Sequence, residues 1–150
     1  MPQGGTDFIF GVMTMPSPLQ DKTKAFALEI IKVCNEIKRT KRESVLTNQL
    51  IRSGTSIGAN IREAVYAHGK SDFIAKLQIA LKECSESEYW LELLIESGYY
   101  DDSAVLNQCT EVKRLLIRDI FHICDNYIFQ IKKLCGIIVR EHRDHPFDCV

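Results

Sequence analysis

Apolar residues recur at steps of three and four along four stretches of this chain, and only a few polar residues separate one stretch from the next. This spacing places the apolar side chains on one face of an α-helix. It predicts an all-α chain with helices at about 21–38, 41–67, 72–97 and 104–139. Because short loops make consecutive helices neighbours of opposite direction, we expect an antiparallel up-down-up-down four-helix bundle.

The 150 residues are enough for one domain with a single core. Residues 1–20 contain three of the four prolines and three of the eight glycines, and we interpret them as a flexible N-terminal arm. Phe8, Ile9 and Phe10 could dock on a neighbour, although a disordered tail is the commoner state of such a terminus. Residues 21–140 form the expected bundle, and residues 141–150 form a C-terminal tail.

Hydrophobic residues make up 45% of the chain and charged residues 26%, as in ordinary globular proteins. No segment approaches the roughly 20 apolar residues that a membrane-spanning helix needs. The apolar run "FIFGVM" is too short for a signal peptide and has no basic residue before it. Six cysteines include no CxxC pair and lie mostly among apolar residues. We therefore expect a cytoplasmic protein with reduced thiols and no membrane association.

Several residues between the apolar stretches are typical of helix ends. Thr40 and Glu43 have the spacing of a capping box for the second predicted helix. Gly69 suits a left-handed position after that helix, and Ser71 suits the N-cap of the third. Within the helices, Leu28 and Val65 extend the apolar stripes, and we expect both side chains to face the core.

The segment "RSGTSIGANIREA", residues 52–64, carries two glycines in the middle of the second predicted helix. Each glycine costs about 1 kcal/mol of helix stability relative to alanine, so we expect a compensation. Because Gly54 and Gly58 lie four residues apart, another helix could approach closely on that side. The nearby "AVYAHGKS" satisfies a relaxed phosphate-loop pattern, but that mechanism requires a preceding strand. We therefore expect no nucleotide at Lys70.

The net charge of −1 hides a separation of charge along the chain. From Lys22 to Arg62 there are nine Lys or Arg residues against three Glu, whereas residues 83–102 contain seven acidic residues and no basic one. The molecule or its assembly could therefore have a basic and an acidic face. A polyanionic partner is one interpretation of this pattern, and solvated helix faces are the other.

Asp119 and His122 have the spacing of a ligand pair in a di-iron helix bundle. That chemistry requires a second such pair and further glutamates at matching positions, which the sequence lacks. The tail offers His142, His145 and Cys149, but we interpret it as a mobile end. We expect no metal, no cofactor and no catalytic residue.

Two segments, "LTNQLIRSGTSIGANIREA" and "SDFIAKLQIALKECSESEYWLELLIESGYY", resemble the small bacterial family first described from proteins encoded in 23S rRNA intervening sequences. Accessory proteins of diversity-generating retroelements are similar to this family. The resemblance implies an antiparallel four-helix bundle that assembles into a ring, commonly a pentamer. It implies no enzymatic activity, and it implies an association with nucleic acid. Ala64 replaces the glycine that usually follows the motif glutamate.

The motif positions and the basic residues are the candidate sites. We expect structural or subunit-interface roles for Arg52, Ser56, Asn60, Glu63 and Glu86. The candidate nucleic-acid-binding residues are Lys38, Arg39, Lys41, Arg42, Arg52 and Arg62.

The sequence thus predicts a non-enzymatic homo-oligomer that binds RNA or DNA through a basic rim formed by residues 38–42. The alternative function is a protein-interaction scaffold that binds no nucleic acid. In that case the acidic third helix or the apolar end of the fourth helix, residues 128–139, would dock another protein.

Overall fold

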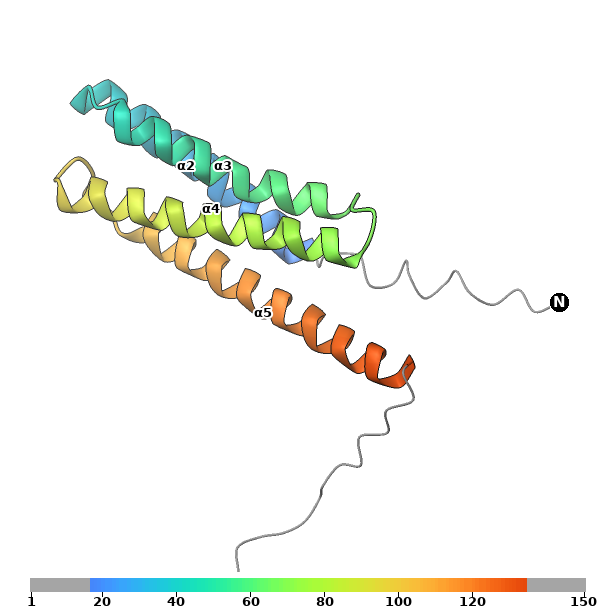
Figure 1. Cartoon of the computed structure of the whole chain (residues 1–150). Coiled ribbons are helices and arrows are strands. Elements are labelled where there is room, and N and C mark those ends of the chain that lie inside the picture. Colours follow the sequence, from blue (N-terminus) through green and yellow to red (C-terminus); the bar gives the residue numbers. More distant parts are fainter. Residues whose placement is uncertain (1–16, 135–150) are drawn as a thin grey trace, which may run out of the picture.

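Four α-helices account for most of residues 17–134, which the computed structural model describes, with side chains described for residues 18–125. The helices are α2 (Ser17–Lys41), α3 (Val45–Ala64), α4 (Lys70–Glu96) and α5 (Ala104–Leu134) (Figure 1). No strand occurs in this part of the chain. The all-α prediction with four helices is therefore confirmed.

Each helix packs against two of the others. α2 packs against α3 and α5, and α4 also packs against α3 and α5, whereas the described residues of the diagonal pairs make no packing contact. Between the helices lies a core of side chains that are almost completely buried. Its largest members are Phe26, Leu19, Ile30, Ile37, Leu50, Ile57, Ile61, Leu77, Leu91, Leu94, Leu116 and Val105.

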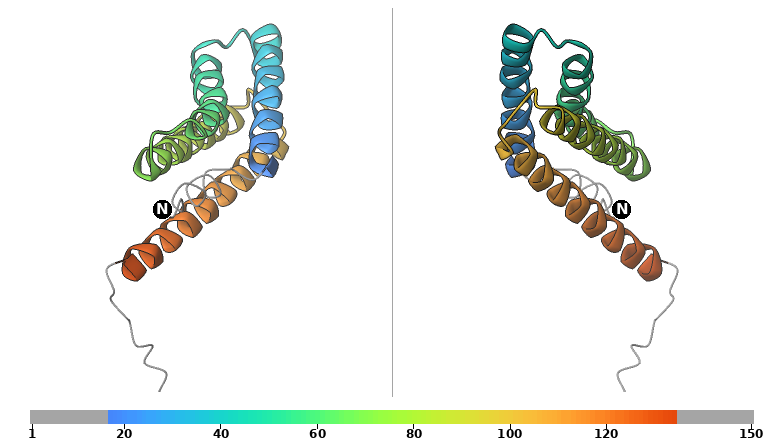
Figure 2. Two further views of the ribbon diagram at one scale, coloured as in Figure 1. Left: turned by 90° about the vertical axis from the view of Figure 1, so that its right-hand side faces the viewer. Right: turned by 90° about the vertical axis from the view of Figure 1, so that its left-hand side faces the viewer.

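The longest helix, α5, packs over only part of its length. Its C-terminal half, orange to red in Figures 1 and 2, extends away from the other helices. Phe121, in the described part of this half, is exposed, and so is Ile117 one turn before it. The apolar residues 128–139, which we predicted to form a partner surface, lie outside the residues whose side chains are described. None of the helices between residues 17 and 134 is long and apolar enough to cross a membrane.

The small residues of α3 let α2 approach closely, as the sequence predicted. A Cβ atom added at Gly54 would lie 3.2 Å from two side-chain carbons of Ile30 on α2. One added at Gly58 would lie 3.5 Å from the Thr23 hydroxyl oxygen. Both glycines belong to a continuous helix, so residues 52–64 are a packing surface and not a loop.

Two predicted core positions are wrong. Leu28 is 52% exposed, because it lies on the side of α2 opposite the buried Phe26 and Ile30. Val65 is also exposed, because α3 ends at Ala64 and the chain leaves the apolar stripe there. The first helix begins at Ser17, four residues before the predicted Asp21.

The helix ends correct three further predictions. Thr40 lies inside α2, where its hydroxyl donates to the Glu36 carbonyl, so it forms no capping box with Glu43. Gly69 has extended backbone, with φ −176°, and is the N-cap of α4, so it is not left-handed. Ser71 lies within α4 and does not cap it. Because α3 precedes this turn, residues 64–71 lack the strand that a phosphate loop requires.

The Glu43 carboxylate caps α3 by itself. Its oxygens accept hydrogen bonds from the backbone N–H groups of Leu46, at 2.7 Å, and Thr47, at 3.0 Å. Partial burial alone would raise the pKa of Glu43, but the hydrogen bonds to Leu46 and Thr47 outweigh it and hold the pKa below its ordinary value of 4.5.

We predict that Glu43→Ala lowers the free energy of unfolding by about 1 kcal/mol at pH 7, as the loss of a helix cap typically does. Because folding lowers the pKa of Glu43, its contribution is present above the unfolded-state pKa and is lost as pH falls through the folded-state pKa. Urea denaturation of the wild type and the variant should therefore show a difference in the free energy of unfolding at pH 7 that becomes smaller below about pH 4.5. If this difference is unchanged at pH 3, the charge of Glu43 is not involved.

Candidate functional site

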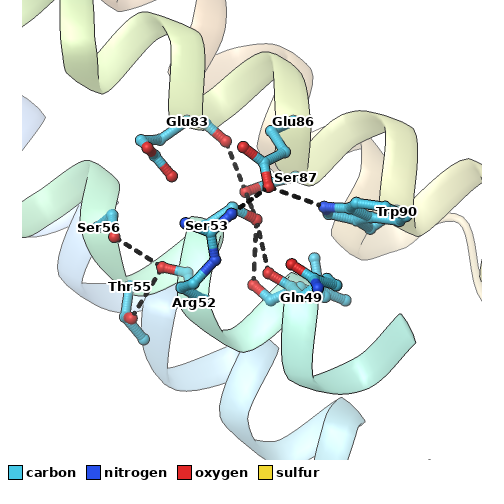
Figure 3. A network of polar contacts seen from close by, with 10 residues as sticks. Gln49, Arg52, Ser53, Thr55, Ser56, Glu83, Glu86, Ser87 and Trp90 are labelled. Carbon is cyan, nitrogen blue, oxygen red and sulfur yellow. Dashed lines mark hydrogen bonds and ion pairs between the residues drawn. The ribbon is translucent and has the colours of Figure 1, made fainter. Parts of the chain in front are cut away.

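A line of polar contacts, here called the α3–α4 seam, joins Arg52 and Ser53 of α3 to Glu86, Ser87 and Trp90 of α4 (Figure 3). The Arg52 guanidinium donates to Glu86 Oε1 at 2.7 Å, and the Trp90 indole N–H donates to the same oxygen at 3.2 Å. Beneath them the buried hydroxyls of Ser87 and Ser53 are hydrogen bonded at 2.9 Å. The fold thus brings Arg52 and Glu86 together, although they are far apart in the sequence.

The two serine hydroxyls of the seam are also hydrogen bonded to backbone carbonyls of their own helices. Ser53 Oγ lies 3.1 Å from the Gln49 carbonyl oxygen, and Ser87 Oγ lies 2.8 Å from that of Glu83. Hydroxyls that bond to backbone carbonyls position helices and are not activated as nucleophiles. Sequence reasoning missed Ser87, although its spacing from Cys84 and Leu91 places it on the buried stripe of α4.

The remaining motif residues do not join the seam directly. The Asn60 side chain donates to the Ser56 carbonyl, and the Ser56 hydroxyl donates to the Arg52 carbonyl, so both bond within α3. Glu63 is exposed and forms an ion pair of 2.6 Å with Lys76 of α4, which raises the pKa of that lysine. Asn60 and Glu63 therefore do not share a buried polar network.

We expect the Arg52–Glu86 pair to be weakly stabilising, because the arginine side chain is 61% exposed and solvent screens the charges. A double-mutant cycle with Arg52→Ala and Glu86→Ala should give a coupling energy of about 0.5 kcal/mol that decreases with added salt. The exposed pair Lys32–Glu29 is the control, and its coupling should be no larger. A coupling above about 2 kcal/mol would instead indicate a desolvated pair.

The two helical residues considered for metal binding differ in exposure. Asp119 is almost completely buried and one of its oxygens pairs with Arg118 at 2.9 Å, while His122 lies at the surface. The described residues contain no group of three or more His, Cys, Asp or Glu side chains that could hold a metal ion. The tail residues His142, His145 and Cys149 lie outside the described part of the chain.

Four of the six candidate nucleic-acid-binding residues meet where α2 turns into α3. This α2–α3 corner consists of Lys38, Arg39 and Lys41 in the last turn of α2, followed directly by Arg42. The Lys38 ammonium donates to the side-chain oxygen of Asn48 at 2.7 Å, and the other three side chains are exposed. Cations in the last turn of a helix also complement its dipole, so part of this charge has a structural explanation.

The other two basic candidates are not at the corner. Arg52 lies about two turns along α3 and is held by Glu86. Arg62 is exposed in the last turn of α3, about 25 Å from the start of that helix at 1.5 Å per residue. The six residues therefore do not form one continuous site within a single chain.

Arg42 has a left-handed backbone conformation, with φ +55°, and no other non-glycine residue in the described part of the chain has a positive φ. This conformation costs an L-residue about 1 kcal/mol, which glycine would avoid. The arginine at this position therefore presents its charge to solvent while its backbone conformation lowers the stability of the fold. Strain of this kind is typical of functional positions.

Acidic residues lie near the same end of the bundle. Figure 1 shows the α2–α3 turn and the α4–α5 turn at one end of the helices. In the α4–α5 turn, partial burial raises the pKa of Tyr100, and the carboxylates of Asp102, Glu29 and Glu36 raise it further. A polyanion would therefore be attracted to the α2–α3 corner and repelled by the α4–α5 turn.

Comparison with known proteins relates the chain to a family and to a solved structure. The model of the family described as 23S rRNA-intervening sequence protein matches residues 18–118. No curated protein matches the chain. A crystal structure of a protein with unknown function, from the S23 ribosomal protein family of Bacteroides thetaiotaomicron VPI-5482, is 47% identical and has a TM-score of 0.67. The match covers 68% of this chain and 97% of the other.

Proposed function

The chain belongs to the 23S rRNA-intervening sequence protein family, and from that premise we propose that it is a non-enzymatic, self-associating helix bundle that binds nucleic-acid phosphates. The binding surface is the α2–α3 corner, and the ligand is the backbone of RNA or DNA. Several corners brought side by side in an assembly would form a basic rim. Such a rim binds polyanions with an affinity that falls steeply as salt increases.

The left-handed conformation of Arg42 is the observation that carries this proposal. Glycine is the residue that a turn of this kind favours, because it has no Cβ atom to clash. An arginine there is best explained by its guanidinium, which binds phosphate oxygens through two parallel hydrogen bonds. Arg39 and Lys41 are exposed beside it and supply further positive charge.

Self-association is supported by apolar side chains that the single chain leaves uncovered. Phe121 of α5 is 65% exposed, and Ile117 lies one turn earlier on the same side. Phe121 belongs to the C-terminal half of α5, which extends away from the other helices (Figure 2). We propose that each subunit is an antiparallel up-down-up-down bundle and that the subunits form a ring, such as a pentamer. Later residues of α3 contact earlier residues of α2, which supports the antiparallel order.

The test is light scattering of the 17.2 kDa protein, alone and with structured RNA or duplex DNA, at low and high salt. We expect an oligomer whose mass increases with nucleic acid at low salt and returns to that of the protein at high salt. An oligomer that ignores both nucleic acids at every salt concentration would exclude the corner as a phosphate site and favour the protein-interaction scaffold. A monomer would exclude the assembly.

A further inference from the structure

A groove of about 410 Å³ runs between α2 and α5 on the surface of the bundle. Its apolar lining includes Leu28 of α2, which is exposed, together with Phe26 of α2 and Val112 of α5, which are almost completely buried. Leu28 is the exposed member of this set, and its outward position is the one that the apolar pattern of α2 did not predict. A half-exposed leucine at the edge of a groove offers a contact for the apolar side chains of another segment.

Charged residues border the groove. Lys22 of α2 forms an ion pair with Glu111 of α5 across it. Lys32 and Glu29 form a second ion pair further along α2. A segment that fits this surface needs apolar side chains to contact Leu28 and few charges of its own, because the rims carry both signs.

The chain contains such a segment immediately before α2. Residues 7–13, "DFIFGVM", hold five large apolar side chains and a single charge. In an extended strand Phe8 and Phe10 point to the same side, so both rings could enter one groove. Each phenylalanine side chain can bury about 150–250 Å².

The length of chain between this segment and the groove permits docking within one molecule. Leu28 lies eleven residues after Ser17, which is about 17 Å along α2 at 1.5 Å per residue. Phe8 and Phe10 precede Ser17 by nine and seven residues, which span at most about 30 Å and 23 Å when extended. Pro16 stands immediately before α2 in the sequence, where the chain would have to reverse, and proline favours turns.

We propose that residues 7–13 fold back and dock along the α2–α5 groove of the same chain, with Phe8 and Phe10 beside the exposed Leu28 side chain. In this direction Asp7 lies beyond Phe8 and approaches Lys32, whose charge is complementary. The covalent connection gives the segment a millimolar effective concentration, about what short flexible links provide, so its own groove is occupied before that of a neighbour. The proposal does not depend on nucleic-acid binding.

The experiment is a double-mutant cycle in the full chain, with Phe10→Ala and Leu28→Ala, monitored as the urea midpoint of unfolding. We expect each single variant to lower the midpoint, and the double variant to lower it no further than the more affected single one. Phe10→Ala combined with Tyr66→Ala is the control, because Tyr66 is exposed in the turn between α3 and α4, away from the groove, and their effects should add.

Hydrogen exchange of the wild-type protein and the Phe8→Ala/Phe10→Ala variant shows whether residues 7–13 of the same chain or those of a second copy occupy the groove. In the proposed arrangement, the variant exchanges faster at residues 22–32, and the difference is the same at every protein concentration. Additive midpoints with unchanged exchange would overturn the proposal. A difference that appears only at high concentration would also overturn it, because the segment would then occupy the groove of a second copy.

Discussion

Replacing Gly54 by leucine is expected to destabilise the protein by about 3 kcal/mol or more, the upper range for inserting methylene groups into a packed core. A Cβ atom at this position already lies 3.2 Å from Ile30, and Ile30 is itself completely buried in the core. The additional carbons of leucine can be accommodated only if α2 and α3 move apart. Urea denaturation followed by circular dichroism at 222 nm would measure the loss.

Gly58→Ala is the matched control, one turn later on the same face of α3. Its new Cβ atom would contact Thr23 at an ordinary 3.5 Å, so the helix gains alanine's higher propensity without a clash. We expect this variant to be more stable than the wild type by about 0.5–1 kcal/mol. If leucine at position 54 were tolerated as well as alanine at position 58, the close approach of α2 and α3 would be disproved.

Charge reversal at the α2–α3 corner should have the largest effect on ligand binding. We expect Lys41→Glu with Arg42→Glu to lower the affinity for RNA or DNA by roughly 100-fold at low salt. The slope of log affinity against log salt should fall by about one for each phosphate contact that is lost. Both residues are exposed and outside the core, so the unfolding midpoint reports whether the fold is retained. Fluorescence anisotropy of labelled RNA at several salt concentrations would measure the affinity.

Lys82→Glu with Arg114→Glu makes the same change of net charge elsewhere, on exposed positions of α4 and α5. An equal loss of affinity in this control would assign binding to overall charge and not to the corner.

The variant Arg42→Gly is expected to change stability and nucleic-acid binding in opposite directions. It removes the left-handed strain and should stabilise the protein by about 0.5–1 kcal/mol, while it weakens nucleic-acid binding. A variant that is more stable and binds as well as the wild type would show that Arg42 has no part in binding.

The helices were predictable because their signal is local. Phe26, Ile30 and Ile37 recur at the period of an α-helix, and any chain with that pattern buries the same face. The close approach at Gly54 was also predictable, since two glycines in a helix interior need a compensating contact. The family motif could be recognised for a similar reason, because its residues stand at helical spacing within α3 and α4.

The sequence by itself determined the number and kind of helices, the stripe that each buries and the family to which the chain belongs. Only the tertiary structure decided that Glu86 meets Arg52, that Leu28 borders a groove and that Arg42 is left-handed. The apolar period is a property of a single helix. It predicts which face of that helix is buried, but not which residues of the other helices this face contacts. The partner depends on how far each helix is rotated and shifted against the others, and the packing of all four helices sets these quantities together.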